Sequence, residues 1–166
     1  MPPREKTALT LGAQAMQQAL SVAACEANDI DWIIASSETH IEYPSLAAQL
    51  HKRTKVREKC RVLDAGGACL GLLNALAVVQ SFVDSGRAQN LAVVTADVHR
   101  RTLVPGRVAG EFGGLFGDGA SAFVLRNARG VEKSVGYFLG RFFFGCANQY
   151  ADAICVAGVE NGGLAV

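Results

Sequence analysis

The chain has 166 residues, a length that suits one domain with a buried core. Half of the residues are hydrophobic, 19% are charged and the formal net charge is +1, so the composition does not favour a nucleic acid or an anionic membrane as partner. No apolar run approaches the about 18 residues of a transmembrane helix, and residues 1–6 lack the apolar core of a signal peptide. We therefore expect a cytoplasmic protein.

Hydrophobic periodicity predicts helices that alternate with strands. In chain order the sequence predicts an amphipathic helix over 7–24, a strand over 32–35, a short helix from Pro44 to about Lys52, a strand over 61–64, a helix over 69–85, and strands over 91–96 and 120–125. The aromatic-rich residues 134–144 fit one further strand. This alternation indicates an α/β fold with a mostly parallel sheet.

Local residue chemistry sets several boundaries of these elements. Pro44 suits the first turn of a helix because its φ is fixed and its missing N–H costs nothing there. Gly86 is expected just beyond the helix over 69–85, where positive φ is needed. That helix carries apolar residues on most of its sides, so we expect it to be buried. These apolar residues are Leu72, Leu73, Leu76, Val79, Phe82 and Val83.

Cys69 follows Gly66-Gly67-Ala68, where a tight turn leads into the helix over 69–85. The unpaired N–H groups and the positive dipole end of a helix favour an anion, and therefore a thiolate, at this place. The same N–H groups can stabilise negative charge on a carbonyl oxygen, so the pattern suits a nucleophile for acyl transfer. The alternative is an ordinary buried cysteine, the default for all five cysteines, which form no C-x-x-C pair.

The stretch Gly67-Ala68-Cys69-Leu70-Gly71 also fits a nucleophile elbow with cysteine in place of serine. An α/β-hydrolase of that kind needs an acid and then a histidine after the nucleophile. His99 is the only later histidine, and it lies just after a predicted strand. A cysteine hydrolase is therefore the weaker interpretation.

Four stretches lie in an order and at spacings that match a known family: DIDWIIASSETHIEYPSLAAQL, VLDAGGACLGLLNAL, SFVDSGRAQNLAVVTADVHRRT and FGDGASAFVL. Together they resemble the N-terminal half of β-ketoacyl-acyl-carrier-protein synthase III, a thiolase-fold condensing enzyme, over about residues 7–127. The resemblance implies one half of a thiolase-like fold, with residues 1–166 forming a single N-terminal domain. The family's first strand and its whole C-terminal half have no counterpart in these residues.

The resemblance implies roles for individual residues. Cys69 matches the acyl-accepting cysteine, and its own N–H would form part of the oxyanion hole. Phe116 lies where the family lines its acyl pocket, and Tyr43 matches an aromatic that reaches into the partner subunit's pocket. Arg107 lies near the place where the family receives coenzyme A and the carrier protein. Ordinary packing for the two aromatics and a solvated charge for the arginine remain open alternatives.

The stretch Gly117-Asp118-Gly119 matches a turn beside the family's active site, and we expect a structural role for it. The family's catalytic histidine and asparagine lie in its C-terminal half, and none of His40, His51 and His99 matches that histidine. Neither a metal nor an organic cofactor is implied.

The function implied is acyl transfer from a coenzyme A or carrier-protein thioester to Cys69, then decarboxylative Claisen condensation in fatty-acid or polyketide-type biosynthesis. We expect this chain not to complete the reaction alone, and to act as a homodimer or with a complementing C-terminal-half chain. The alternative is a non-catalytic fragment, or one subunit of a split enzyme, that binds acyl chains or a partner chain.

Overall fold

The computed structural model describes residues 6–99, 116–127, 136–150, 159–160 and 163–164. The chain divides into two compact units, Met1–Gly136 and Tyr137–Val166. The predicted contact residue Arg107, together with all of residues 100–115, lies outside the described residues.

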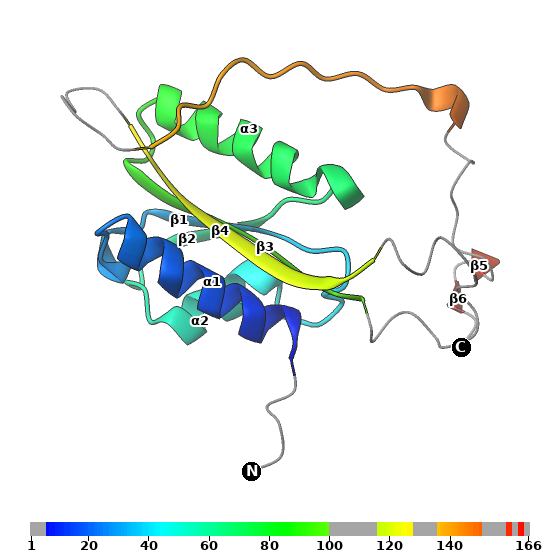
Figure 1. The fold of residues 1–166 in the computed structure, drawn as a ribbon, viewed down its shortest axis with the longest axis horizontal. Helices are drawn as coiled ribbons and strands as arrows, with labels where there is room; N and C mark the ends of the chain where they lie inside the picture. The colour runs from blue at the N-terminus through cyan, green and yellow to red at the C-terminus, as the bar shows by residue number, and fades with distance from the viewer. Residues whose placement is uncertain (1–5, 100–115, 128–135, 151–158, 161–162, 165–166) are drawn as a thin grey trace, which may run out of the picture. The chain divides into compact units, whose positions relative to one another are not determined.

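Helices and strands alternate along most of the first unit (Figure 1). Its elements are α1 (Ala8–Val22), η1 (Ala27–Asp29), β1 (Trp32–Ser36), α2 (Leu46–Thr54), β2 (Arg61–Asp64), η2 (Ala68–Leu70), α3 (Gly71–Asp84), β3 (Asn90–Val98) and β4 (Asp118–Arg126). The second unit contains η5 (Asn148–Tyr150), β5 (Val159–Glu160) and β6 (Gly163–Leu164), and the last two pair as antiparallel strands.

The first unit is built on a four-stranded sheet with the order β2-β1-β3-β4. β1 is parallel to both β2 and β3, so that Ile33 pairs with Val62 on one side and with Ala92 on the other. β4 is antiparallel to β3. The predicted mostly parallel mixed sheet is therefore confirmed. The carboxyl ends of the three parallel strands meet at one edge of the sheet, which we call the carboxyl edge.

Helices cover both faces of this sheet, as Figure 1 shows: α1 and α2 lie on one face and α3 lies on the other. Two cores result. On the face of α1 and α2, Met16, Leu46 and Leu50 pack with Ile33 and Val94. The α3 face buries a second group of apolar residues: Ile34, Ala75, Val79, Ala88, Leu91 and Val93.

The start of α2 differs from the prediction. The helix begins at Leu46, with Ser45 as N-cap, and not at Pro44. The Asp64 carboxylate at the end of β2 accepts hydrogen bonds from the N–H groups of Leu46 (2.9 Å) and Ala47 (2.9 Å). A carboxylate on these unpaired donors stabilises the helix N-terminus, which explains the observed start.

The helix over 69–85 was expected to be buried, but only one side of α3 is buried. Gly71, Ala75 and Val79 are buried, whereas Leu73 on the same helix is 47% exposed. A helix on the outer face of a single sheet can bury only the side that faces the strands. Its predicted end is confirmed, because Gly86 follows α3 with φ of 69°.

Two further expectations are corrected by the pairing of strands. Asp118 and Gly119 were expected in a turn, but they begin β4, opposite Val98 and Asp97 respectively, because the ladder with β3 extends to these residues. Gly117 alone of that stretch lies outside the strand. Residues 136–144 form no strand in the described part of the chain, and no ladder there supplies hydrogen bonds to them.

Candidate active site

Cys69 lies in the 3-10 turn η2, between the end of β2 and the first residue of α3, Gly71. Its side chain is exposed. The predicted strand, glycine turn and helix around the cysteine are therefore confirmed. The thiol is therefore accessible at the carboxyl edge, beside the first residue of α3, where a substrate can approach it.

The backbone of the turn before Cys69 is unusual. Gly67 has φ of 128° and Ala68 has φ of 48°, so two consecutive residues lie at positive φ. Glycine accepts this conformation freely, but for alanine the left-handed region costs about 1–2 kcal/mol. The turn closes with a hydrogen bond from the Leu70 N–H to the Gly67 carbonyl (2.9 Å). Such a conformation persists only where its surroundings hold it.

Asn74, one turn into α3, contacts this turn from the helix side. Its Nδ2 donates a hydrogen bond to the Gly66 carbonyl (3.0 Å). A Cβ added to Gly67 would lie 2.2 Å from the same Nδ2. Glycine at 67 is thus required both by its φ and by the Asn74 amide that lies against it.

Gly71, two residues after Cys69, packs closely against Ser36. A Cβ added there would lie 2.0 Å from the Ser36 Oγ at the end of β1. Ser36 is 7% exposed and is the buried polar residue of the described core. The absence of a side chain at Gly71 therefore lets α3 begin in close contact with the carboxyl end of β1.

Asp97, near the end of β3, organises the loop that follows β1. Its Oδ1 accepts hydrogen bonds from the N–H groups of Glu38 (2.7 Å) and Thr39 (3.2 Å) and from the hydroxyl groups of Ser37 (3.1 Å) and Thr39 (3.2 Å). The Thr39 Oγ1 in turn accepts the Val98 N–H (2.9 Å). The first residues of the loop that leads to Tyr43 are therefore fixed to β3.

The predicted pocket residues lie in segments that meet the same carboxyl edge. Tyr43, in the loop between β1 and α2, is 97% exposed. Phe116 lies just before β4, and its ring centroid is 4.9 Å from that of His99, which directly follows β3. Within the described part of the chain, no hydrogen bond or ring contact joins Cys69 to either aromatic.

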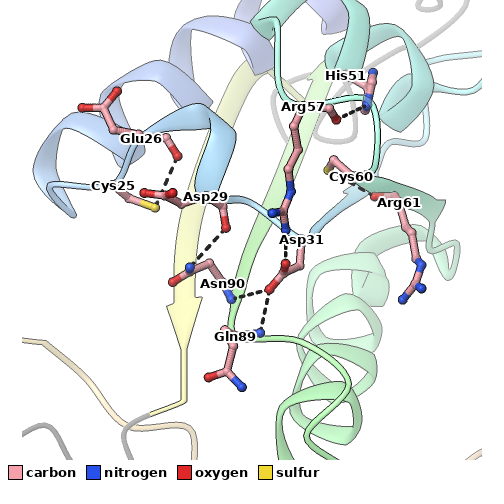
Figure 2. Close-up of polar contacts among 10 residues, drawn as sticks. All are labelled: Cys25, Glu26, Asp29, Asp31, His51, Arg57, Cys60, Arg61, Gln89 and Asn90. Carbon is pink, nitrogen blue, oxygen red and sulfur yellow. Dashed lines mark hydrogen bonds and ion pairs between the residues drawn. The ribbon is translucent and has the colours of Figure 1, made fainter.

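At the opposite end of the sheet, where the parallel strands begin, Asp31 contacts residues of neighbouring segments, as Figure 2 shows. Its Oδ1 pairs with Arg57, and its Oδ2 accepts the N–H groups of Gln89 (2.7 Å) and Asn90 (3.1 Å). The Asp31 carbonyl also accepts the Arg61 N–H (2.9 Å), so one residue ties the beginnings of three strands together.

Cys60 lies near Asp31 and Arg57 and is unsuited to act as a nucleophile. Burial raises the pKa of its thiol to about 11, an effect that the nearby Arg57 guanidinium only partly offsets. Cys25 is likewise buried, whereas Cys146 is exposed. Among the cysteines in the described ranges, Cys69 is thus the accessible thiol on the carboxyl edge.

The described residues contain neither a candidate metal site nor a membrane-spanning helix. No group of three or more His, Cys, Asp or Glu side chains there could hold a metal ion. No described helix is long and apolar enough to cross a membrane.

The sequence did not identify the residues that fix the turn around Cys69 and the neighbouring loops at the carboxyl edge, namely Asn74, Ser36, Asp64 and Asp97. Asn74 carried a signal, because it is a lone amide among the apolar residues that begin α3. Asp64 and Asp97 each lie at the end of a predicted strand, the usual place for functional polar groups in such sheets. Ser36 carried no signal that pointed to Gly71.

A mixed, mostly parallel sheet with helices on both faces is the architecture of part of a thiolase-fold enzyme. The fold matches a crystal structure of 3-oxoacyl-[acyl-carrier-protein] synthase III from Aquifex aeolicus VF5 with a TM-score of 0.67 and 29% identity, covering 74% of this chain and 39% of that one. It matches a second crystal structure of a 3-oxoacyl-(acyl-carrier-protein) synthase III with a TM-score of 0.74 and 27% identity, covering 91% of this chain and 43% of that one.

Sequence comparison points to the same family. The family model for 3-oxoacyl-[acyl-carrier-protein (ACP)] synthase III matches residues 63–140. The beta-ketoacyl-[acyl-carrier-protein] synthase III of Haemophilus ducreyi is 36% identical over 126 residues, which cover 74% of this chain and 38% of that protein. The resemblance seen in the sequence is therefore confirmed, and the chain is a relative of β-ketoacyl-acyl-carrier-protein synthase III. It spans about 38% of the length of the curated relatives that it matches.

Proposed function

We propose that this chain carries the nucleophile of a β-ketoacyl-acyl-carrier-protein synthase III-type acyltransferase, and that Cys69 is the residue that accepts the acyl group. The observation that supports this most directly is the exposed Cys69 thiol at the turn between β2 and α3, within the region that the family model matches. The names of the relatives supply the substrate class, a thioester of an acyl carrier protein.

In the first step the Cys69 thiolate attacks the carbonyl carbon of an acyl-coenzyme A or acyl-carrier-protein thioester. A bond forms between Sγ and this carbon, the bond to the donor sulfur breaks, and the released thiolate takes a proton from water. The backbone N–H of Cys69 donates to the oxyanion that develops on the carbonyl oxygen. Tyr43 and Phe116 are proposed to line the acyl pocket, and Arg107 to contact coenzyme A or the carrier.

The second step is the condensation. A malonyl-carrier thioester loses carbon dioxide, and the carbanion attacks the acyl group on Sγ and releases the Cys69 thiolate. The resemblance assigns the decarboxylation to a histidine and an asparagine in the part of the family that these residues do not match. Removal of one oxyanion donor typically costs about 100- to 1,000-fold in rate. We therefore expect the 166-residue polypeptide by itself to form an acyl-enzyme at most.

Intact-mass spectrometry tests both steps. The purified chain is incubated with an acyl-coenzyme A, and the mass of one acyl group is expected on the wild type and on Cys146→Ser but not on Cys69→Ser. The Cys146 variant is the matched control because, among the four cysteines in the described ranges, it removes the other exposed thiol. An adduct that persists in Cys69→Ser would refute the assignment. After malonyl carrier protein is added we expect no β-ketoacyl product, and a product that depends on Cys69 would show that these residues suffice.

We further propose that the chain associates, as a homodimer or with a complementing chain. Val62 and Leu63 on the edge strand β2 are exposed, and so are Leu70 (55% exposed) on the turn and Leu73 on α3. An apolar surface of this kind favours a protein partner. Light scattering at micromolar concentration should show a dimer or a larger assembly, and a monodisperse monomer would contradict the homodimer.

A further inference from the structure

Asn74 has no assigned part in the acyl transfer proposed above, yet it contacts the backbone just before the nucleophile. It lies in an otherwise apolar stretch of α3, and its amide nitrogen donates to the Gly66 carbonyl at 3.0 Å. The same nitrogen occupies the space that a Gly67 side chain would need, at 2.2 Å from the position of that Cβ. One side chain therefore both binds the turn and fills the space beside it.

The turn needs such a contact because its backbone does not favour the observed shape by itself. Gly67 and Ala68 both have positive φ, and an alanine is disfavoured there by about tenfold relative to its ordinary conformations. Ala68 directly precedes Cys69, so any relaxation of its φ and ψ changes the direction in which the Cys69 backbone and side chain point. A contact that holds Gly66 and Gly67 in place thereby limits the freedom of Ala68.

We propose that Asn74 is a positioning residue for Cys69: its amide holds the turn Gly66-Gly67-Ala68 in the conformation, with positive φ at Gly67 and Ala68, that presents the thiol to a thioester. The catalytic meaning of this role rests on the proposed function of Cys69, but the effect on the thiol can be measured without acyl transfer. Asn74 acts through the backbone and takes no part in proton or acyl transfer.

The test measures the rate at which iodoacetamide alkylates Cys69 between pH 6 and pH 9, by peptide mapping of each sample. Cys146, which is exposed in the second unit, serves as the internal reference. Asn74→Ala and Asn74→Leu both remove the donor, and the leucine keeps most of the side-chain volume. Ser81→Ala is the matched control on α3, because the Ser81 hydroxyl donates only within its own helix, to the Ala77 carbonyl (3.1 Å).

We expect both Asn74 variants to slow the alkylation of Cys69 by about tenfold, the factor by which the left-handed alanine is disfavoured. The rate at Cys146 should not change, and Ser81→Ala should match the wild type at both thiols. Ala68→Gly supplies a readout that a merely structural role would not move. Glycine accepts positive φ without strain, so in the Ala68→Gly background the effect of Asn74→Ala should fall below about threefold.

The outcomes separate this proposal from the proposed function. A cooperatively folded Asn74→Ala, or Asn74→Leu if the alanine variant does not fold, that alkylates at the wild-type rate would overturn the positioning role. So would an equal effect of Asn74→Ala with and without Ala68→Gly. If the wild-type thiol is alkylated in an Asn74-dependent way but is never acylated by acyl-coenzyme A, the positioning role stands and the acyl-transfer function fails.

Discussion

The close contact between Gly71 and Ser36 can be tested by the addition of one methyl group. In Gly71→Ala the new Cβ would lie 2.0 Å from the Ser36 Oγ and 3.2 Å from the Ser36 Cβ. The φ of Gly71 is −54° and its ψ is −41°, so alanine fits the backbone without strain. Both residues are buried, and the clash can therefore be relieved only if α3 shifts or the Ser36 side chain turns.

The expected loss follows from two opposing terms. Extra volume in a packed site typically costs about 1–3 kcal/mol of unfolding free energy. Alanine gains up to about 1 kcal/mol over glycine in a helix, and less at its first residue. We therefore expect Gly71→Ala to lower the free energy of unfolding by about 1–2 kcal/mol. Ser36→Ala removes the atom at 2.0 Å and leaves 3.2 Å as the closest approach, so the double variant should recover most of that loss.

Urea unfolding followed by circular dichroism measures these differences, and the four proteins form a double-mutant cycle. Gly66→Ala is the matched control in the same turn, because no heavy atom lies within 4 Å of its Cβ position. We expect that control to stay within about 0.5 kcal/mol of the wild type, as uncrowded substitutions do. The reasoning is refuted if Gly71→Ala is as stable as Gly66→Ala, or if its loss is unchanged by Ser36→Ala.

Three further predictions concern stability. Asp64→Ala removes the two hydrogen bonds at 2.9 Å that cap α2, and should cost about 1–2 kcal/mol in urea unfolding, with a smaller loss in Asp64→Asn. Lys55 ends α2 with φ of 55°, so Lys55→Gly should stabilise the chain by up to about 1 kcal/mol in thermal melts, whereas Lys52→Gly inside the helix should destabilise it by a similar amount. Burial raises the pKa of the Cys60 thiol from 9.0 to about 11, so the folded state keeps a proton that the unfolded chain releases. The resulting stabilisation is complete below pH 9 and is lost as the pH rises to 11. Over this range the free energy of unfolding of the wild type should fall by up to about 3 kcal/mol more than that of Cys60→Ala. Equal losses in the two proteins would contradict the raised pKa of Cys60.

The elements of the first unit could be predicted because their signals are local. The strand over 61–64 has the predicted bounds, and α1 begins one residue after the predicted start because Thr7 forms a capping box with Thr10. Apolar periodicity and turn residues act over a few positions, so a single sequence reveals them. The position of Cys69 at the junction of strand and helix followed from the same signals.

The contacts that shape the site could not be predicted, because they join residues remote in sequence. Gly71 lies against Ser36, and Asp97 binds a loop about sixty residues earlier in the chain. The pairing of β4 with β3 decides that Asp118 belongs to a strand, although its Asp-Gly sequence favours a turn. In each case a tertiary partner overrides or supplements the local preference.

The two close contacts flank Cys69 in the sequence: Asn74 contacts the turn that precedes it, and Ser36 lies against Gly71, the first residue of α3. A shift of Gly71 should therefore change the alkylation rate of Cys69 as well as stability, and Ser36→Ala should restore both. Gly12→Ala separates this local effect from general destabilisation. Its Cβ would lie 3.2 Å from the Val94 Cγ1, in the core on the other face of the sheet. At equal loss of stability, Gly71→Ala should alter Cys69 alkylation and Gly12→Ala should not. Equal changes in both would mean that the thiol responds to the opening of the whole fold and not to the turn that carries it.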